Sequence, residues 1–187
     1  MPKLLIKNVR MAFPAIYEPE AFGDGDPAYG AKFIISQSHP QLAEIRKAVA
    51  LAASEKWGEK AASILALLKD DKKVAWVEGP YRNKNGDIYD GFEGMYHLST
   101  RNGGKAPVKP SVFDQQNRPV TQADGAVYSG CYVDASIEFY AQDNGYGRRI
   151  NCSLRGVRKA ADGDSFGGGA SASADEFGAP ADIEDFV

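Results

Sequence analysis

The sequence predicts one mainly β domain with a helical insertion, an α+β architecture, followed by an acidic C-terminal tail. From Lys73 onward, short β-type segments separated by turn residues recur without intervening helices, which favours an antiparallel sheet or barrel over repeating βαβ units. A region after Ser38 carries clear helical periodicity. Residues 160–187 are mostly Gly, Ala, Ser and acids, which cannot bury a core, so we expect this tail to be disordered.

The N-terminal part predicts two strands. Residues 3–13 are rich in Leu, Ile and Val and should form a first strand that stops at Pro14. Residues 17–29 combine prolines, glycines and acids, which is typical of a surface loop. Residues 30–36 are again apolar and predict the second strand.

Two helices should follow the second strand. Ser38 is expected to be an N-cap with Gln41 at the capping-box position, and Gly58 is expected to end the first helix. Residues 59–69 predict a second, shorter helix, and Trp57 at the junction should pack in the core. The apolar residues at helical spacing are Leu42, Ile45, Val49 and Ala52 in the first helix and Ala61, Ile64, Leu65 and Leu68 in the second.

The last β-hairpin can be predicted in register from Asn144-Gly145, because Asn-Gly is a strong hairpin signal. A polar face then pairs Tyr140 with Arg149 and Asp134 with Arg155. The opposite face should belong to the core, with the pairs Phe139–Ile150, Ile137–Cys152 and Ala135–Leu154.

A second Asn-Gly pair predicts another hairpin around Asn85-Gly86. The same reasoning places Arg82 opposite Tyr89 and Tyr81 opposite Asp90. An arginine therefore lies beside a flat ring in both hairpins.

Charge divides the chain into a basic body, residues 1–159, and an acidic tail, residues 160–187. All 22 Lys and Arg residues and 18 of the 25 acids precede residue 160, so the body carries +4 and the tail only acids. A basic body with a polyanionic tail is expected where the tail competes with another polyanion, most often nucleic acid. The alternative is a tail that serves solubility.

Composition argues against several other classes. The chain has no apolar run long enough to span a membrane and does not begin with a signal-peptide pattern, so no membrane partner is expected. Cys131 and Cys152 have no metal-ligand spacing and are expected to be reduced thiols in the core. We therefore expect no metal, no cofactor and no catalytic residues.

Aromatic and basic residues alternate along the predicted sheet. Single-stranded nucleic acids bind by stacking bases on aromatic rings while Lys and Arg contact the phosphates, so these residues are candidates for such a site. Many of the rings could instead fill the barrel or cover its edges. The candidates are Tyr81, Arg82, Lys84, Tyr89, Phe92, Tyr96, Arg101, Lys105, Lys109, Tyr132, Tyr140, Tyr146, Arg148, Arg149 and Arg155.

Two other functions are open alternatives. Asp87, Asp90 and Glu93 could hold a metal ion for phosphodiester hydrolysis, although this spacing is common in loops. The chain could also be a structural or assembly protein whose acidic tail serves solubility or docking and whose basic β surface contacts protein. RNA is a further possible ligand, since stacking and charge do not select against the 2′-hydroxyl.

Several segments resemble a family of bacteriophage single-stranded DNA-binding proteins. The most specific are residues 128–137 and 140–151, with sequences YSGCYVDASI and YAQDNGYGRRIN, followed by LRGVR at 154–158. The opening residues 5–10 and Phe13-Pro14, and the FGGG and ADEF segments of the tail, also fit this family. The likeness spans nearly the whole chain.

The resemblance implies an OB-fold, a five-stranded Greek-key barrel, although an insertion after the second strand departs from the minimal barrel. It implies sequence-independent protection of single-stranded DNA in phage replication, recombination or repair, in the cytoplasm of the infected host. It also implies a tail that recruits phage or host replication proteins, such as a polymerase, helicase or primase. The expected docking residues are Asp182, Glu184, Asp185 and Phe186, and a homodimer is possible.

Overall fold

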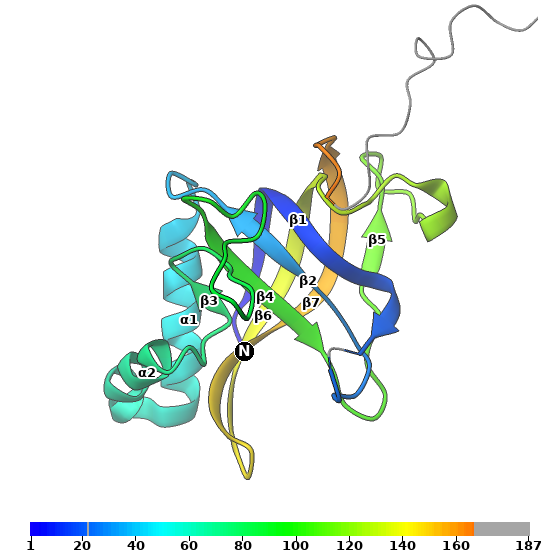
Figure 1. Ribbon diagram of the computed structural model, residues 1–187. Coiled ribbons are helices and arrows are strands. Elements are labelled where there is room, and N and C mark those ends of the chain that lie inside the picture. Colours follow the sequence, from blue (N-terminus) through cyan, green and yellow to red (C-terminus); the bar gives the residue numbers. More distant parts are fainter. Residues whose placement is uncertain (22, 167–187) are drawn as a thin grey trace, which may run out of the picture.

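The computed structural model describes residues 1–21 and 23–166 of the 187-residue chain. A seven-stranded sheet curves into a barrel, with two helices on one side (Figure 1). Across the sheet the strand order is β3-β4-β2-β1-β6-β7-β5, with β5 and β7 parallel and the other neighbours antiparallel. The strands are β1 (Lys3–Glu20), β2 (Ala28–Ile35), β3 (Trp76–Val77), β4 (Tyr96–Asn102), β5 (Ser111–Phe113), β6 (Tyr132–Asn144) and β7 (Gly147–Ala161).

The barrel closes where β4 and the segment before β3 meet β7. A parallel bridge joins Val74 to Ile150. The side-chain amide of Asn102 donates to the Leu154 carbonyl at 2.7 Å, and its oxygen accepts the Leu154 N–H at 2.8 Å. Because β1 pairs with both β2 and β6, five long strands surround one core.

The predicted class is confirmed: the protein is mainly β with a helical insertion. The prediction of five strands is wrong, since the sheet has seven. The five long strands β1, β2, β4, β6 and β7 make up the OB barrel, while β3 has two residues and β5 has three. Segments this short carry no periodic pattern, so the sequence could not indicate them.

β1 is longer than predicted and continues through Pro14 to Glu20. Its register shifts between Ile6 and Val9 against β6 and between Ala12 and Ala15 against β2. These bulges bend the strand around the barrel. The missing N–H of Pro14 falls where the ladder is already interrupted, so this proline does not end the pairing.

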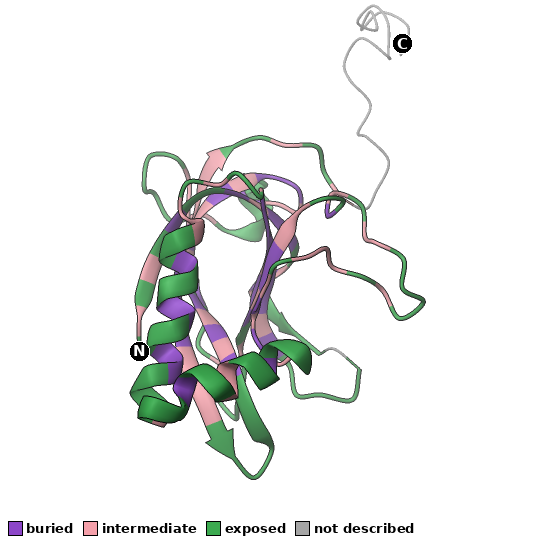
Figure 2. Cartoon of the chain, turned by 90° about the vertical axis from the view of Figure 1, so that its left-hand side faces the viewer, coloured by how far each residue is buried: buried purple, intermediate pink, exposed green. Residues whose placement is uncertain are grey.

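Two helices follow β2, as predicted: α1 (Leu42–Trp57) and α2 (Ala61–Asp70), joined by a 3₁₀ turn, η1 (Gly58–Lys60). A second 3₁₀ turn, η2 (Gln122–Asp124), precedes β6. The core-facing residues of α1 are Ile45, Ala48, Val49, Ala52 and Ala53, and Figure 2 shows this buried side against the barrel. None of the described helices has the length and hydropathy needed to cross a membrane.

The predicted capping box at Ser38 is wrong. The helix begins at Leu42 without a side-chain cap, and the Ser38 hydroxyl bonds to Ser36 instead. The Gln41 side chain is used by β1: its oxygen accepts the Lys7 N–H at 2.8 Å, and its amide donates to the Leu5 carbonyl at 2.9 Å. Tertiary hydrogen bonds to a bulged strand therefore replace the local cap.

The β6–β7 hairpin has the predicted faces but a register offset by two residues. Its turn is Gly145-Tyr146, because Asn144 pairs with Gly147, whose φ is 101°. Phe139 therefore lies opposite Cys152. An offset of two residues keeps every side chain on its predicted face, so the predicted core residues are buried.

All five predicted cross-strand pairs of this hairpin are consequently wrong, and on the core face Ile137 lies opposite Leu154 and Ala135 opposite Val157. Tyr140 lies opposite Asn151, and Asp134 lies opposite Arg158 because the register shifts again between Ser136 and Ile137. The Arg158 guanidinium contacts the Asp134 carboxylate at 2.6 Å.

The structured part of the chain extends beyond the expected boundary at residue 159. β7 continues to Ala161, and residues 162–166, which we call the C-terminal strap, lie against residues 128–130. The Phe166 N–H donates to the Ser129 carbonyl at 3.0 Å. The expected disorder of residues 160–187 is therefore wrong for residues 160–166; the remainder, 167–187, lies outside the described residues.

Candidate nucleic-acid interface

The side of β2 and β4 that points away from the main core carries mostly polar residues. Ala31, Phe33 and Leu98 point into the core. The alternate residues are Lys32, Ile34, His97, Ser99 and Arg101, and we call this side the β2–β4 face. Ile34 and His97 are buried beneath neighbouring rings, whereas Arg101 is exposed. In OB barrels, oligonucleotides bind on the face of the second and third strands, and β2 and β4 hold these positions among the long strands.

An aromatic layer borders the β2–β4 face and consists of Phe13, Tyr81, Tyr89 and Phe92. The Tyr81 and Tyr89 rings stack with centroids 4.9 Å apart and an interplanar angle of 15°. Phe13 meets Tyr89 edge-on at 5.1 Å, and Phe92 packs beneath Tyr81 at 5.6 Å. The layer thus combines a bulge of β1 with the segment between β3 and β4.

Exposure separates the rings that could meet a ligand from those that could not. Phe13 is 42% exposed, whereas Phe92 is 1% exposed and cannot offer a ring face in this structure. Tyr81 and Tyr89 are half-buried, with Ala12, Ile34 and Phe92 as the small core beneath them. The expectation that Phe92 stacks a base is therefore not supported.

The hairpin that carries Tyr81 and Tyr89 differs by one residue from its predicted register. Tyr81 lies opposite Tyr89, since the Tyr89 N–H donates to the Tyr81 carbonyl at 3.1 Å, and Arg82 bridges to Ile88. The Asn83 side-chain oxygen accepts two backbone N–H groups of the loop, which widens the turn. The two tyrosines therefore stack on each other. Arg82 and Lys84 are exposed beside them.

Lys32 lies at the junction of the β2–β4 face and the aromatic layer. Its ammonium is 3.9 Å from the centroid of the Tyr81 ring and donates to the Ser99 hydroxyl at 2.6 Å. Burial lowers the pKa of Lys32 to about 8. Burial also raises the pKa of Tyr81 and lowers that of His97, whose Nδ1 donates to the Gly79 carbonyl at 2.7 Å.

On the other side of the layer, the C-terminal strap contacts Arg10. The guanidinium lies 4.0 Å from the centroid of the Phe166 ring and donates to the Asp164 carbonyl at 2.7 Å and the Gly130 carbonyl at 3.0 Å. A Cβ atom at Gly91 would lie 2.6 Å from the Phe166 ring, so the strap is closely packed against this loop.

Three predicted cations lie at the end of β4 and in the connection to β5. Arg101 is exposed on the β2–β4 face, and its guanidinium donates to the Asp26 carbonyl of the β1–β2 loop at 3.1 Å. Lys105 and Lys109 are exposed in the connection to β5. They continue the positive charge of the β2–β4 face beyond the end of β4.

The β6–β7 hairpin brings together four further predicted residues. Tyr146 at its tip is 93% exposed, and Arg148 and Arg149 follow it. Arg148 pairs with Asp143 at 3.2 Å, which also accepts the Trp57 indole N–H at 2.8 Å. Tyr140 is half-buried, and its pKa is raised by burial. The hairpin is the loop between the last two barrel strands, which OB-folds also use for oligonucleotides.

The remaining three predicted residues lie in other surroundings. Tyr96 packs edge-on against Trp76 at 5.7 Å and onto the main core. Tyr132 is paired across the sheet with Arg10. Arg155 is exposed and lines, with Arg158, a hollow of about 330 Å³ beside β5.

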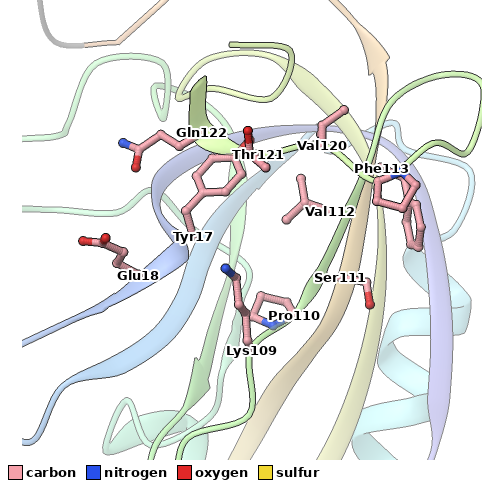
Figure 3. Close-up of a pocket in the computed structure, with 11 residues that line it drawn as sticks. Tyr17, Glu18, Lys109, Pro110, Ser111, Val112, Phe113, Val120, Thr121 and Gln122 are labelled. Carbon is pink, nitrogen blue, oxygen red and sulfur yellow. The ribbon is translucent and has the colours of Figure 1, made fainter. Parts of the chain in front are cut away.

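A separate cavity of about 400 Å³ lies between β1, β5 and the segment before η2. Tyr17, Val112, Val120 and Lys109 surround it (Figure 3). The Tyr17 hydroxyl donates to the Val127 carbonyl at 3.0 Å. Lys109 is the one predicted binding residue in its lining.

The acidic triplet is not arranged as a metal site. Within residues 1–21 and 23–166, no group of three His, Cys, Asp or Glu side chains is placed to hold a metal ion. The Asp87 carboxylate accepts the Asn83 amide at 3.2 Å, and the Glu93 carboxylate accepts the Gly91 N–H at 2.9 Å. Asp87, Asp90 and Glu93 therefore do not form such a group in the described part of the chain.

Comparison with solved structures defines the class of fold. The single-stranded DNA-binding protein from bacteriophage Enc34 in complex with ssDNA superposes with a TM-score of 0.71, at 23% identity, over 88% of this chain and 89% of that one. The single-stranded DNA-binding protein gp2.5 of bacteriophage T7 gives a TM-score of 0.56 at 11% identity, over 92% and 99% of the two chains. The barrel thus has the fold of phage single-stranded DNA-binding proteins.

Sequence comparison makes the assignment specific. The model of the Enterobacter phage Enc34 ssDNA-binding protein family matches residues 2–187. Protein p50 of Acyrthosiphon pisum secondary endosymbiont phage 1 is 37% identical over 179 residues, which cover 94% of this chain and 92% of that protein. The chain belongs to the Enc34 ssDNA-binding protein family, which confirms the resemblance noted in the sequence.

Three residues of this surface have no functional prediction from the sequence. Phe13 stands at the end of the predicted first strand, and Arg10 and Lys32 stand within predicted strands. The signal for Lys32 was present, because a lysine between apolar residues of a strand lies on the face opposite the core. No local signal indicated that a bulge would turn Phe13 towards Tyr89.

Proposed function

We propose that this protein binds single-stranded DNA without sequence preference, on the β2–β4 face and the adjoining aromatic layer. The observation that carries the proposal is the junction of exposed or half-buried rings, at Phe13, Tyr81 and Tyr89, with the cations Lys32 and Arg101. Unpaired bases stack on rings while cations neutralise phosphates, and neither interaction requires a particular base. Binding would protect exposed strands in the infected cell.

The first test removes one ring while keeping its apolar volume. Phe13→Leu should weaken binding to poly-dT by about 1–3 kcal/mol, the value of one base stacked on an aromatic residue. The matched control is Leu67→Ala on α2, an exposed apolar residue (65%) that belongs to neither the face nor the layer. Fluorescence anisotropy with labelled poly-dT at low salt gives both affinities.

Two results would contradict the proposal. The first is a wild-type chain that leaves poly-dT unbound at low salt, which is the outcome expected of a structural or assembly protein. Alternatively, Phe13→Leu and Leu67→Ala could bind equally well, which would place the strand elsewhere on the barrel. The same assay with poly-U compares RNA with DNA.

We further propose that the acidic tail recruits phage or host replication proteins. The support is compositional: residues 167–187 hold five acids and no Lys or Arg, and they include the segment Asp182-Ile-Glu-Asp-Phe-Val187. Such a segment offers negative charge with a small apolar group to a basic, pocketed surface. The proposed docking residues, Asp182 to Phe186, lie outside the described residues.

The tail proposal has its own test. Phe186→Ala should leave poly-dT affinity unchanged while reducing capture of the phage or host polymerase in a pull-down with the purified enzyme. The control is Phe177→Ala, which removes a ring from the same tail at a different place. Equal capture by the two variants and the wild type would refute a docking role for Phe186.

A further inference from the structure

Lys32 is a half-buried cation without a carboxylate partner. None of the ion pairs formed within residues 1–21 and 23–166 includes it. The buried surroundings of its ammonium contain a ring face, a hydroxyl and a neutral imidazole, which solvate a charge less well than water does. An anion bound beside Lys32 would remove this unfavourable free energy.

The geometry leaves the ammonium able to accept such an anion. A lysine ammonium has three N–H donors. One donates to Ser99 at 2.6 Å and one side of the group faces the Tyr81 ring at 3.9 Å, so one N–H is left for a ligand oxygen. Lys32 lies opposite Ser99 in the register of β2 and β4, at the middle of the β2–β4 face.

We propose that Lys32 is a phosphate-binding residue of this face and that single-stranded DNA binding is coupled to uptake of a proton by its amine. The inference rests on the proposed function and deepens it. A phosphate beside the ammonium favours the charged form, so the bound complex holds the Lys32 proton to higher pH than the free protein does.

The groups around Lys32 do not titrate in the same range. His97 on β4 is kept neutral by burial, and Tyr81 on the hairpin keeps its proton because burial raises its pKa. On β1, the residue opposite Lys32 is Ala12, and Arg10 and Arg101 are the fixed positive charges on neighbouring positions of this side of the sheet. Lys32 is therefore the group of the face that changes charge between pH 7 and 9.

The test compares the wild type with Lys32→Arg, whose guanidinium stays charged across this range. With a pKa of about 8 for Lys32, wild-type affinity for a labelled adenine oligonucleotide should fall about tenfold more than Lys32→Arg affinity between pH 7 and pH 9. Calorimetry at pH 8 in two buffers of different ionisation enthalpy should show uptake of about half a proton by the wild type alone.

Controls separate this inference from the proposed function. Lys47→Met on α1 removes an exposed lysine away from the face and should keep the wild-type pH profile. If the wild type and Lys32→Arg both bind DNA and take up equal numbers of protons, the proposed role of Lys32 is overturned while the proposed function stands. Loss of all wild-type binding at both pH values would overturn the proposed function as well. Thermal unfolding checks that Lys32→Arg is folded.

Discussion

Gly130 and Asp164 approach so closely that a larger residue does not fit at position 130. The Gly130 backbone has a φ of 107°, its carbonyl accepts from Arg10, and an added Cβ would overlap the Asp164 carbonyl. This contact fixes the C-terminal strap to the start of β6. Glycine is therefore required here both for its conformation and for the space it leaves.

We predict that Gly130→Ala destabilises the fold by more than the about 1–2 kcal/mol that a left-handed conformation costs a non-glycine residue. The control is Gly86→Ala, because Gly86 also has a positive φ (89°) but no neighbouring atom within 4 Å of the added Cβ. Urea unfolding of both variants gives the comparison. Equal losses of stability would mean that the strap yields to the methyl group.

The lowered pKa of Lys32 also predicts how the free energy of unfolding depends on pH. The folded pKa of Lys32, about 8, is below the ordinary value of 10.5, so the unfolded chain binds more protons between these two pH values. The free energy of unfolding should therefore gain a contribution that rises with pH in that window. Lys32→Met should lack it, which urea unfolding at pH 8 and pH 10 would detect as a flatter profile. If the free energy of unfolding changes equally with pH in the wild type and in Lys32→Met, burial does not lower the pKa of Lys32.

At the scale of elements, the strap belongs to the domain and not to the tail. The Tyr128 hydroxyl bonds to Asp162 and Gly163 at 3.0 Å, Lys159 pairs with Asp162 at 2.7 Å, and Phe166 completes the small core under the aromatic layer. A boundary drawn from composition alone at residue 159 leaves the strap out of the domain, because Asp and Gly have the same composition in a strap as in a tail.

We predict that a chain ending at residue 161 is less stable than a chain ending at residue 166. The shorter chain lacks the ring at Arg10 and leaves the Gly130 carbonyl region uncovered. Differential scanning calorimetry of the two truncations, with the full chain as reference, measures the difference. Identical melting temperatures would show that the strap contributes nothing to the fold.

The elements show where sequence reasoning succeeded. Periodicity identified α1, α2 and the faces of β6 and β7, because burial of a face imposes the pattern directly. It failed where long-range contacts decide: the bulge that carries Phe13, the Gly145-Tyr146 turn, and the stacking of Tyr81 on Tyr89. Of the predicted binding residues, Tyr81 and Tyr89 lie in the aromatic layer, but the prediction did not include Lys32, whose ammonium contacts both the Tyr81 ring and Ser99 of β4.

At the scale of the whole molecule, charge should determine how binding responds to salt. Residues 1–159 carry +4, and Arg101 is an exposed cation on the β2–β4 face. For single strands, the logarithm of the binding constant falls with the logarithm of salt concentration by about 0.7 per phosphate neutralised. The slope of this plot therefore gives the number of phosphates that the protein neutralises.

We predict that Arg101→Gln lowers the magnitude of this slope by about 0.7, as expected for the loss of one phosphate contact. Phe13→Leu should weaken binding without changing the slope, because a ring contributes stacking and no charge. Lys69→Gln on α2 is the charge control. Titrations with poly-dT over a series of salt concentrations give all three slopes, and an unchanged slope for Arg101→Gln would remove it from the interface.

The position of β1 between β2 and β6 has a consequence for synthesis of the protein. Lys3 pairs with Glu138, so one edge of the first strand stays open until more than two thirds of the chain has left the ribosome. Open strand edges pair readily with other chains, and such distant pairings form slowly. Nascent chains stalled before β6 should therefore be the species that aggregates or recruits chaperones, and release of β6 should end this vulnerability.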